Sequence, residues 1–188
     1  MNKRSFIGIV MSLLMLNLVG CRTATMIDLI HKETDMLKVT DDVMVDSKFN
    51  KYRVGGTLFK PFIERNPQEL GQGFSNYSLI LNVYKMKKDN SKVTVNNIKI
   101  LGSKKVDFKG VDIDLTSPIE FTEDRDNPSI LVSNTTVIEE IYKGNMKLNE
   151  DSLLTVSLTV TVEVNGKKIT KDLTYEFETL IRTYAIQR

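Results

Sequence analysis

The dipeptide Asn165-Gly166 lies between two segments in which apolar and polar residues alternate, and it is the strongest constraint on the fold. Asn-Gly suits a two-residue β-hairpin turn because both residues tolerate positive φ. A turn at these residues also fixes the register, since Val164 must then face Lys167 and every later pair follows in step. The sequence therefore predicts a long C-terminal hairpin.

The predicted register separates the hairpin into an apolar face and a polar face, as expected for strands with one buried side. The apolar face pairs Val162 with Ile169, Leu158 with Leu173, Val156 with Tyr175, and Leu154 with Phe177, while the polar face pairs Glu163 with Lys168, Thr161 with Thr170, Thr159 with Asp172, and Ser157 with Thr174. One pair departs from this pattern, because Val160 faces Lys171. We expect the Lys171 stem to reach out to solvent at an edge.

The same period-two alternation recurs from Val39 onward, with turn residues between the segments and no long helical pattern. The clearest sets are Leu79, Leu81 and Val83; Val93 and Val95; and Val111, Ile113 and Leu115. Many short strands with closely spaced turns predict an all-β fold. We expect an antiparallel β-sandwich, immunoglobulin-like or transthyretin-like, with about seven to nine strands. A small β-barrel is the alternative.

Three local segments carry turn or helix signals. Asn66 to Gly71 has the features of a single helical turn, with a capping residue, a proline and an exit glycine, inside a loop running roughly over residues 60–76. The glycines Gly55 and Gly56 predict a turn. Residues 135–143 fit either a strand or a short helix, and their β-branched residues favour the strand.

The N-terminal segment has the composition of a secretory signal. Lys3 and Arg4 precede an uncharged, largely apolar run that ends at Leu18-Val19-Gly20-Cys21, and Cys21 is the only cysteine of the chain. The run is somewhat short for a membrane-spanning helix, which needs about 20 apolar residues. These four residues resemble the lipobox of bacterial lipoproteins, in which a leucine and a small residue precede the cysteine.

The resemblance implies cleavage before Cys21, diacylglycerol on its sulfur, and an acyl chain such as palmitate on the new amino terminus. Two or three chains hold a protein stably on a membrane, whereas one chain holds it only marginally. Arg22 stands where inner-membrane lipoproteins carry aspartate, so the resemblance implies the outer membrane, on its periplasmic or surface side, in a cell that has one. We therefore expect a signal peptide over residues 1–20, a lipidated tether over residues 21–38 and one sandwich domain over residues 39–188. The alternatives for the tether are a short helix and an edge strand.

Removal of the signal changes the charge of the chain. Residues 1–20 contain Lys3, Arg4 and no acid, so the 26 cationic residues of the chain fall to 24, which equals the number of acidic residues. The mature chain is formally neutral. The sequence consequently gives no support for a nucleic-acid partner.

The residues offer few routes to catalysis. His31 is the only histidine and lies in the expected tether, so a triad that needs a packed histidine is disfavoured. The mature domain lacks the Cys and His ligands of a zinc site, and the glycine pairs lack the Lys-Ser/Thr of a phosphate loop. We predict no catalytic residues, no metal and no cofactor.

Carboxylates are the remaining reactive groups. Four of them gather in the loop between Pro118 and Pro128, namely Glu120, Glu123, Asp124 and Asp126. Such a loop is most often a solvated acidic surface, and it lacks the glycine and late glutamate of an EF-hand. Calcium binding and a carboxylate-based hydrolase remain alternatives.

A mixture of aromatic and basic residues suggests an interaction surface, because interfaces favour aromatics and arginine. The candidates are Phe49, Tyr52, Phe59, Phe62, Arg65 and Phe74. The competing interpretation is that the aromatics build the core of a domain without tryptophan.

The sequence leads to one functional expectation, a membrane-anchored β-sandwich that binds another cell-envelope protein. This architecture is similar to that of small anchored lipoproteins that act as assembly subunits of envelope machines, the type VI secretion lipoprotein among them. Similarity of fold alone is a weak guide to function. The alternative from another class is an envelope lipoprotein that binds a small ligand or calcium.

Overall fold

The computed structural model describes residues 22–66, 76–102, 111–114, 118–133, 136–142 and 153–186. The chain divides into two compact units. The larger unit comprises residues 27–180 and contains the sandwich described below. The smaller unit contains, among the described residues, the strand segments 22–26 and 181–186.

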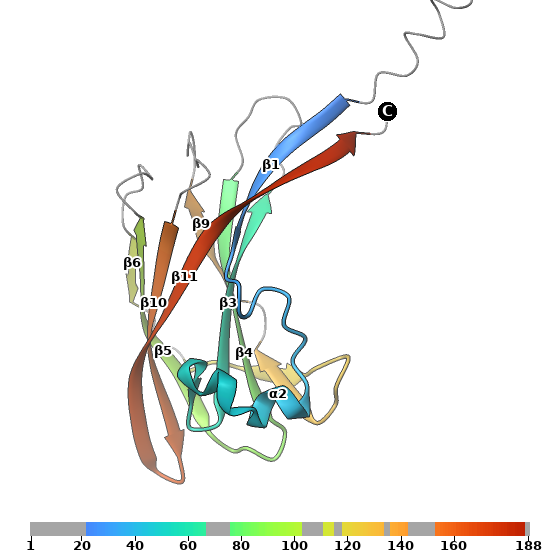
Figure 1. The fold of residues 1–188 in the computed structure, drawn as a ribbon. Coiled ribbons are helices and arrows are strands. Elements are labelled where there is room, and N and C mark those ends of the chain that lie inside the picture. Colours follow the sequence, from blue (N-terminus) through green and yellow to red (C-terminus); the bar gives the residue numbers. More distant parts are fainter. Residues whose placement is uncertain are drawn as a thin grey trace, which may run out of the picture. The chain divides into compact units, whose positions relative to one another are not determined.

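Two β-sheets form the fold (Figure 1). The first has the strand order β1 (Arg22–Ile30), β11 (Lys167–Ile186), β10 (Leu153–Val164), β5 (Lys92–Gly102) and β6 (Val111–Asp114). The second has the order β2 (Arg53–Val54), β3 (Thr57–Asn66), β4 (Asn76–Met86), β8 (Ile130–Ser133) and β7 (Phe121–Glu123), and β9 (Thr136–Tyr142) also pairs with β4. The antiparallel sheets do not close into a barrel. The predicted all-β sandwich is confirmed, and the alternative barrel is wrong.

The predicted C-terminal hairpin is present with the predicted register. Asn165 and Gly166 have φ values of 50° and 79°, which are the positive values that their turn requires. Every facing pair predicted from this turn is found, from Val164 with Lys167 to Leu154 with Phe177. Turn chemistry and alternation together determined the pairing correctly.

Burial along the hairpin differs between its two strands near the turn. Val160 and Val162 of β10 are fully buried, whereas their partners Lys171 and Ile169 are exposed, Ile169 by 39%. The second sheet packs closely on β10 here, because a Cβ placed on Gly55 would lie 3.0 Å from the Val162 side chain. It covers less of β11. The prediction of an exposed Lys171 is confirmed, and Ile169 is more exposed than its apolar position predicted.

The core lies between the two sheets and is built from the inward residues of the alternating strands. Its largest fully buried side chains include Tyr175, Phe59, Phe177, Leu58, Leu79, Ile98, Ile100, Leu154 and Leu158. The Tyr175 hydroxyl donates a hydrogen bond to the Phe59 carbonyl at 2.7 Å and so connects β11 to β3. This bond satisfies a buried polar group that would otherwise destabilise the core.

A β-bulge in β5 changes which residues face the core. The pairing with β10 shifts between Thr159 and Val160, so that Asn96 is the extra residue of β5. Val93 and Val95 are buried before the bulge, and Ile98 and Ile100 are buried after it. The Asn96 amide donates to the Thr161 hydroxyl at 3.0 Å, which ties the bulge to the hairpin.

Two short helices replace the strand expected after Val39. Helix α2 (Asp41–Val45) is capped by Thr40, whose hydroxyl accepts a hydrogen bond from the Val43 N–H. The 3₁₀ helix η1 (Ser47–Tyr52) is capped by Asp46, whose carboxylate accepts from the Lys48 N–H at 2.9 Å. These side-chain caps favour helical turns over extended backbone. The expectation of strands throughout this region is therefore wrong.

Strand β3 occupies part of the predicted loop over residues 60–76. Pro61 lies inside this strand opposite Leu81, although a proline disfavours a central strand. β2 pairs only with Thr57 and Leu58, so no described strand lies beside Pro61 on that side of β3, and the missing N–H of the proline is not needed there. Asn66 ends β3, and the rest of the predicted helical turn lies outside the described residues.

Two other local predictions are confirmed. Gly55 and Gly56 form a turn with φ values of 56° and 87°. The ambiguous segment 135–143 contains β9, so its β-branched residues indicated the correct structure.

Residues 27–38, which the sequence assigned to a tether, belong to the larger unit. Leu29 lies in the hydrophobic core and His31 is buried beside it in sequence. The tether prediction already allowed an edge strand, and β1 is at the edge of its sheet. The alternation of Ile27, Leu29 and His31 is the period-two signal of that strand.

Candidate functional site

The predicted aromatic surface is mostly core. Phe49, Tyr52 and Phe59 are at most 5% exposed, and all three belong to the hydrophobic cluster between the sheets. Helix η1 directs Phe49 and Tyr52 inward, and β3 does the same for Phe59. For Phe49, Tyr52 and Phe59, the alternative interpretation as core residues is therefore correct.

The other predicted interaction residues do not join them into a patch. Phe62 is half-buried on β3. Arg65 forms an ion pair with Asp28 of β1 at 3.1 Å, and the two side chains are 17% and 21% exposed. Phe74, like Leu18, Gly20 and Cys21, lies outside the described residues.

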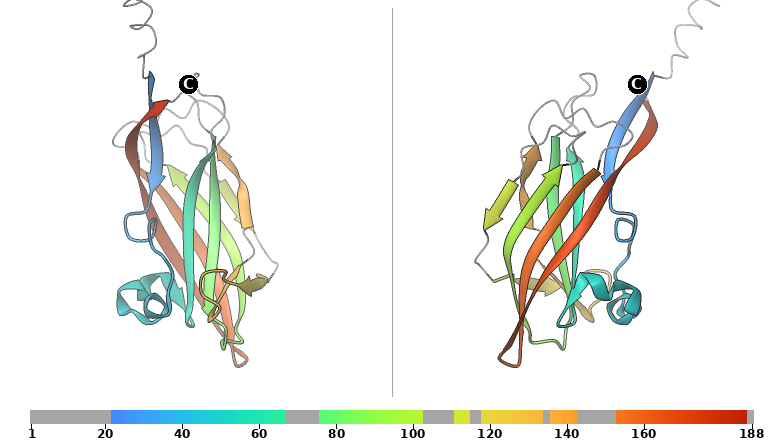
Figure 2. Two further views of the ribbon diagram at one scale, coloured as in Figure 1. Left: turned by 90° about the vertical axis from the view of Figure 1, so that its right-hand side faces the viewer. Right: turned by 60° about the vertical axis from the view of Figure 1, so that its left-hand side comes forward.

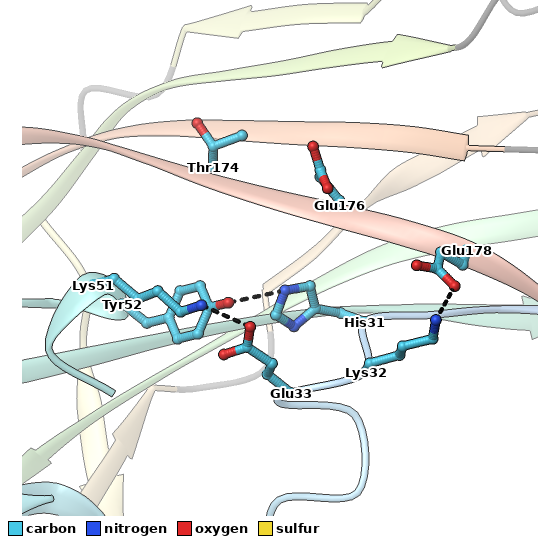
Figure 3. A pocket seen from close by; sticks show the side chains of 8 residues that line it. All are labelled: His31, Lys32, Glu33, Lys51, Tyr52, Thr174, Glu176 and Glu178. Atoms are coloured by element: carbon cyan, nitrogen blue, oxygen red, sulfur yellow. Dashed lines mark hydrogen bonds and ion pairs between the residues drawn. The ribbon is translucent and has the colours of Figure 1, made fainter. Parts of the chain in front are cut away.

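The structure instead brings together a cluster around His31, which follows β1 directly (Figure 3). Its Nδ1 lies 2.8 Å from the Thr34 hydroxyl, and its Nε2 lies 3.1 Å from the Tyr52 hydroxyl. The side chain is only 6% exposed. A histidine with both ring nitrogens bonded and almost no exposure has its orientation fixed.

Aromatic rings surround this imidazole. Tyr52 stacks on Tyr175 with centroids 4.9 Å apart, and the His31 ring meets both tyrosines edge-on at 5.3 and 5.4 Å. Phe177 lies 5.8 Å away. The cluster therefore packs the start of the 31–40 segment and the end of η1 against β11.

Burial is the main influence on the charge of His31 and lowers its pKa. Glu33, Asp35 and Glu176 raise that pKa and Lys51 lowers it, but burial has the largest effect. Burial also raises the pKa of Tyr52. Both rings are consequently uncharged at neutral pH.

A pocket of about 390 Å³ opens beside this cluster. Its lining residues are His31, Lys32, Glu33, Lys51, Tyr52, Thr174, Glu176 and Glu178. Figure 3 shows Thr174 and Glu176 on β11 at one side, with Glu33, Lys51 and Tyr52 at the other. Both cations that line it are paired, Lys51 with Glu33 at 2.6 Å and Lys32 with Glu178 at 2.5 Å.

The geometry of the cluster does not fit nucleophilic catalysis by Thr34. Thr34 is the hydroxyl residue nearest to His31 Nδ1, but it is fully buried and cannot meet a substrate from the pocket. The Tyr52 hydroxyl is held by the imidazole, and its pKa is raised and not lowered. We conclude that this cluster fixes the 31–52 segment.

The acidic loop uses its carboxylates in local contacts. Asp124 accepts hydrogen bonds from the backbone N–H groups of Asp126 and Asn127 at 2.8 and 3.2 Å. Asp126 is 3.5 Å from Lys38, and Glu123 pairs with Lys87. In the part of the chain that the structure describes, no three His, Cys, Asp or Glu side chains are grouped to hold a metal ion.

No helix in the described ranges is both long enough and apolar enough to cross a membrane.

No protein family, curated protein or solved structure matches this chain.

Proposed function

We propose that this chain is a lipid-anchored cell-envelope protein whose β-sandwich binds another envelope protein. The sequence Leu18-Val19-Gly20-Cys21, placed directly after a basic and then apolar segment, carries the proposal. Lipid on Cys21 would hold the sandwich at a membrane surface, since each buried methylene of an acyl chain contributes about 0.8 kcal/mol.

The sandwich supports a binding function through the strands that lie at the edges of its two sheets in the described residues. The strands at the ends of the two sheets are β1 and β6 in one and β2 and β7 in the other. Edge strands present backbone N–H and C=O groups that can pair with a strand of another protein.

Metabolic labelling tests the anchor. Cells that produce the chain are grown with an alkyne-tagged fatty acid, and the purified protein is examined for label. We expect label on the natural chain and none on Cys21→Ser, which should accumulate with residues 1–20 still attached. A natural chain that carries no label, or a labelled Cys21→Ser variant, would contradict the proposal.

Cross-linking in intact cells tests the binding function. The lipidated full chain should form a defined cross-linked product with one envelope protein, and an anchored β-sandwich of unrelated sequence should not. Deletion of the chain should also reduce the level or assembly of that partner. If no specific product forms and no envelope complex changes, the binding function is refuted while the anchor is unaffected.

A further inference from the structure

Near the hairpin turn, one side of β11 has no described strand beside it. β11 has 20 residues, and its two neighbours are β10 with 12 and β1 with 9. β1 ends at Ile30, and the next residue, His31, contacts the rings of Tyr175 and Phe177. Figures 1 and 2 both show β1 ending well short of the hairpin turn. The segment 167–173 therefore has β10 on one side and no described strand on the other.

The backbone of this segment is directed for strand pairing. In a two-residue hairpin the pair that flanks the turn exchanges hydrogen bonds, and bonded and non-bonded pairs then alternate. Val164 with Lys167 is that first pair. The N–H and C=O groups of Lys168, Thr170, Asp172 and Thr174 consequently point away from β10 toward the uncovered side.

The uncovered segment is exposed and basic. Residues 167–172 are all exposed, and they include Lys167, Lys168 and Lys171. Glu163 faces Lys168 across the hairpin, and the Lys171 ammonium donates to the neutral Lys51 carbonyl at 3.4 Å. The one acid of the segment, Asp172, accepts a hydrogen bond from the Thr159 hydroxyl at 2.7 Å. Positive charge thus predominates over residues 167–172.

The pocket beside His31 continues the same edge. Thr174 and Glu176 follow the uncovered segment on β11 and line the pocket, with Lys51 and Glu33 opposite them (Figure 3). A partner strand paired with residues 168–174 would continue along β11 into this pocket. It would lie on the side of β11 that β1 occupies farther along the strand.

We propose that the edge of β11 from Lys167 to Thr174 binds an extended acidic segment of another envelope protein by strand addition. This inference rests on the proposed binding function and identifies its surface and the chemistry of its partner. Backbone pairing provides the contact, and the lysines select for acidic side chains.

The same lysines oppose pairing with a second copy of the chain. Edge-to-edge pairing of two copies would bring the three lysines of one copy close to those of the other. Like charges across a strand pair are destabilising, and lysines on an edge are a common protection against self-association. The lysines therefore stabilise pairing with an acidic strand and destabilise pairing with a second copy of the chain.

Hydrogen exchange measured by mass spectrometry tests the proposal on the full lipidated chain in detergent micelles. The probe is a synthetic peptide of about eight residues that alternates valine with glutamate, and the control peptide alternates valine with lysine. We expect the acidic peptide to slow exchange at least about threefold in the segment 167–174 and to leave β5 unchanged. The basic peptide should have no effect.

Substitutions separate backbone pairing from charge. Lys168→Pro removes an outward N–H while leaving the bonded pairs with β10 intact, and it should weaken binding at least about fivefold. Lys168→Gln tests the charge alone and should weaken binding less. Lys99→Gln, at an exposed position of the inner strand β5, is the matched control and should bind normally. Lower hydrogen-exchange protection of β5 in Lys168→Pro would mean that the proline disturbs the fold. The variant Lys167→Glu/Lys168→Glu is then used in its place and should abolish binding of the acidic peptide.

Four outcomes would overturn the proposal. They are no protection of segment 167–174 by the acidic peptide, equal protection by both peptides, protection of another edge instead, and protection of 167–174 that grows with protein concentration without peptide. The last outcome indicates a second copy as the occupant. Lysine-dependent binding to anionic vesicles, with no acidic-peptide protection, would instead indicate a membrane contact. None of these outcomes affects labelling of Cys21 or cellular cross-linking, so the proposed function can stand or fail independently.

Discussion

The hydroxyl of Tyr52 lies 3.1 Å from Nε2 of His31, although 21 positions separate the two residues in sequence. This contact joins the end of η1 to the end of β1, and the stacking of Tyr52 on Tyr175 extends it to β11. The segment between them carries both short helices. The stability of this segment therefore depends on His31.

Replacing His31 with alanine should destabilise the protein by about 2–4 kcal/mol, because it leaves a cavity and removes a partner from the buried Thr34 and Tyr52 hydroxyls. Urea unfolding followed by tyrosine fluorescence measures the change. Met36→Ala is the control, since Met36 is 88% exposed, and it should change stability by less than about 0.5 kcal/mol. Equal stability of His31→Ala and the natural chain would contradict the role of this contact.

The protein should lose stability as the pH falls below about 6.5, the pKa of His31 in the unfolded chain. Burial lowers the pKa of His31 in the folded state, so the unfolded state binds more protons between the two values. The contribution of neutral His31 is fully present above the unfolded pKa and is lost as the pH falls through the folded pKa. Glu33 has a lowered pKa because Lys51 bonds its carboxylate, and its effect begins only below about pH 4.5.

Thermal unfolding between pH 8 and pH 5 checks this prediction. His31→Gln should show a flatter profile between pH 7 and pH 5.5. Because the chain has one histidine, NMR of its imidazole protons reports the folded pKa directly. An imidazole pKa above 6.5 would contradict the expected direction.

Two glycine substitutions should differ in cost for a structural reason. Gly166→Ala places a Cβ in open space at φ 79° and should cost about 1 kcal/mol from backbone strain alone. Gly55→Ala adds a contact of 3.0 Å with the buried Val162 at φ 56°, and should cost about 2–3 kcal/mol. Chemical denaturation of both variants measures the difference, and a Gly166→Ala variant less stable than Gly55→Ala would disagree with the packing of β2 on β10.

Calcium should leave the stability of the protein unchanged. An ion that binds the native state must raise the unfolding temperature. However, Asp124 already accepts hydrogen bonds from backbone N–H groups, and Asp126 already pairs with Lys38. Thermal unfolding in millimolar calcium should shift by less than about 1 °C, with magnesium as the control for ionic strength. A larger shift specific to calcium would restore the acidic loop as a binding site.

The register of the C-terminal hairpin could be predicted because its information is local. The turn at Asn165-Gly166 determines the register, and alternation assigns each residue to a face. The bulge at Asn96 is also visible afterwards, as the buried positions change from Val95 to Ile98. The sequence alone does not show this change, because Val93 and Val95 fit one alternating strand, and Ile98 and Ile100 fit another whose buried positions are shifted by one residue.

The cluster at His31 depends on contacts that no local pattern reveals. It joins residues from β1, η1 and β11, and their proximity follows only from the order of the strands. Leu29 and His31 are both buried, but the neighbouring apolar residues Met26, Ile27 and Ile30 leave the segment without a clean two-residue period. Helix η1 was missed because its cap, Asp46, resembles an exposed strand or turn residue.

Mass spectrometry of the N-terminal peptide of the mature protein, extracted from membranes, tests the lipid anchor. The mature chain should begin at Cys21 and carry diacylglycerol on its sulfur, with a further acyl chain on the amino group in an organism that adds one. A mature chain that retains residues before Cys21, or that begins at Cys21 with an unmodified thiol, would contradict it.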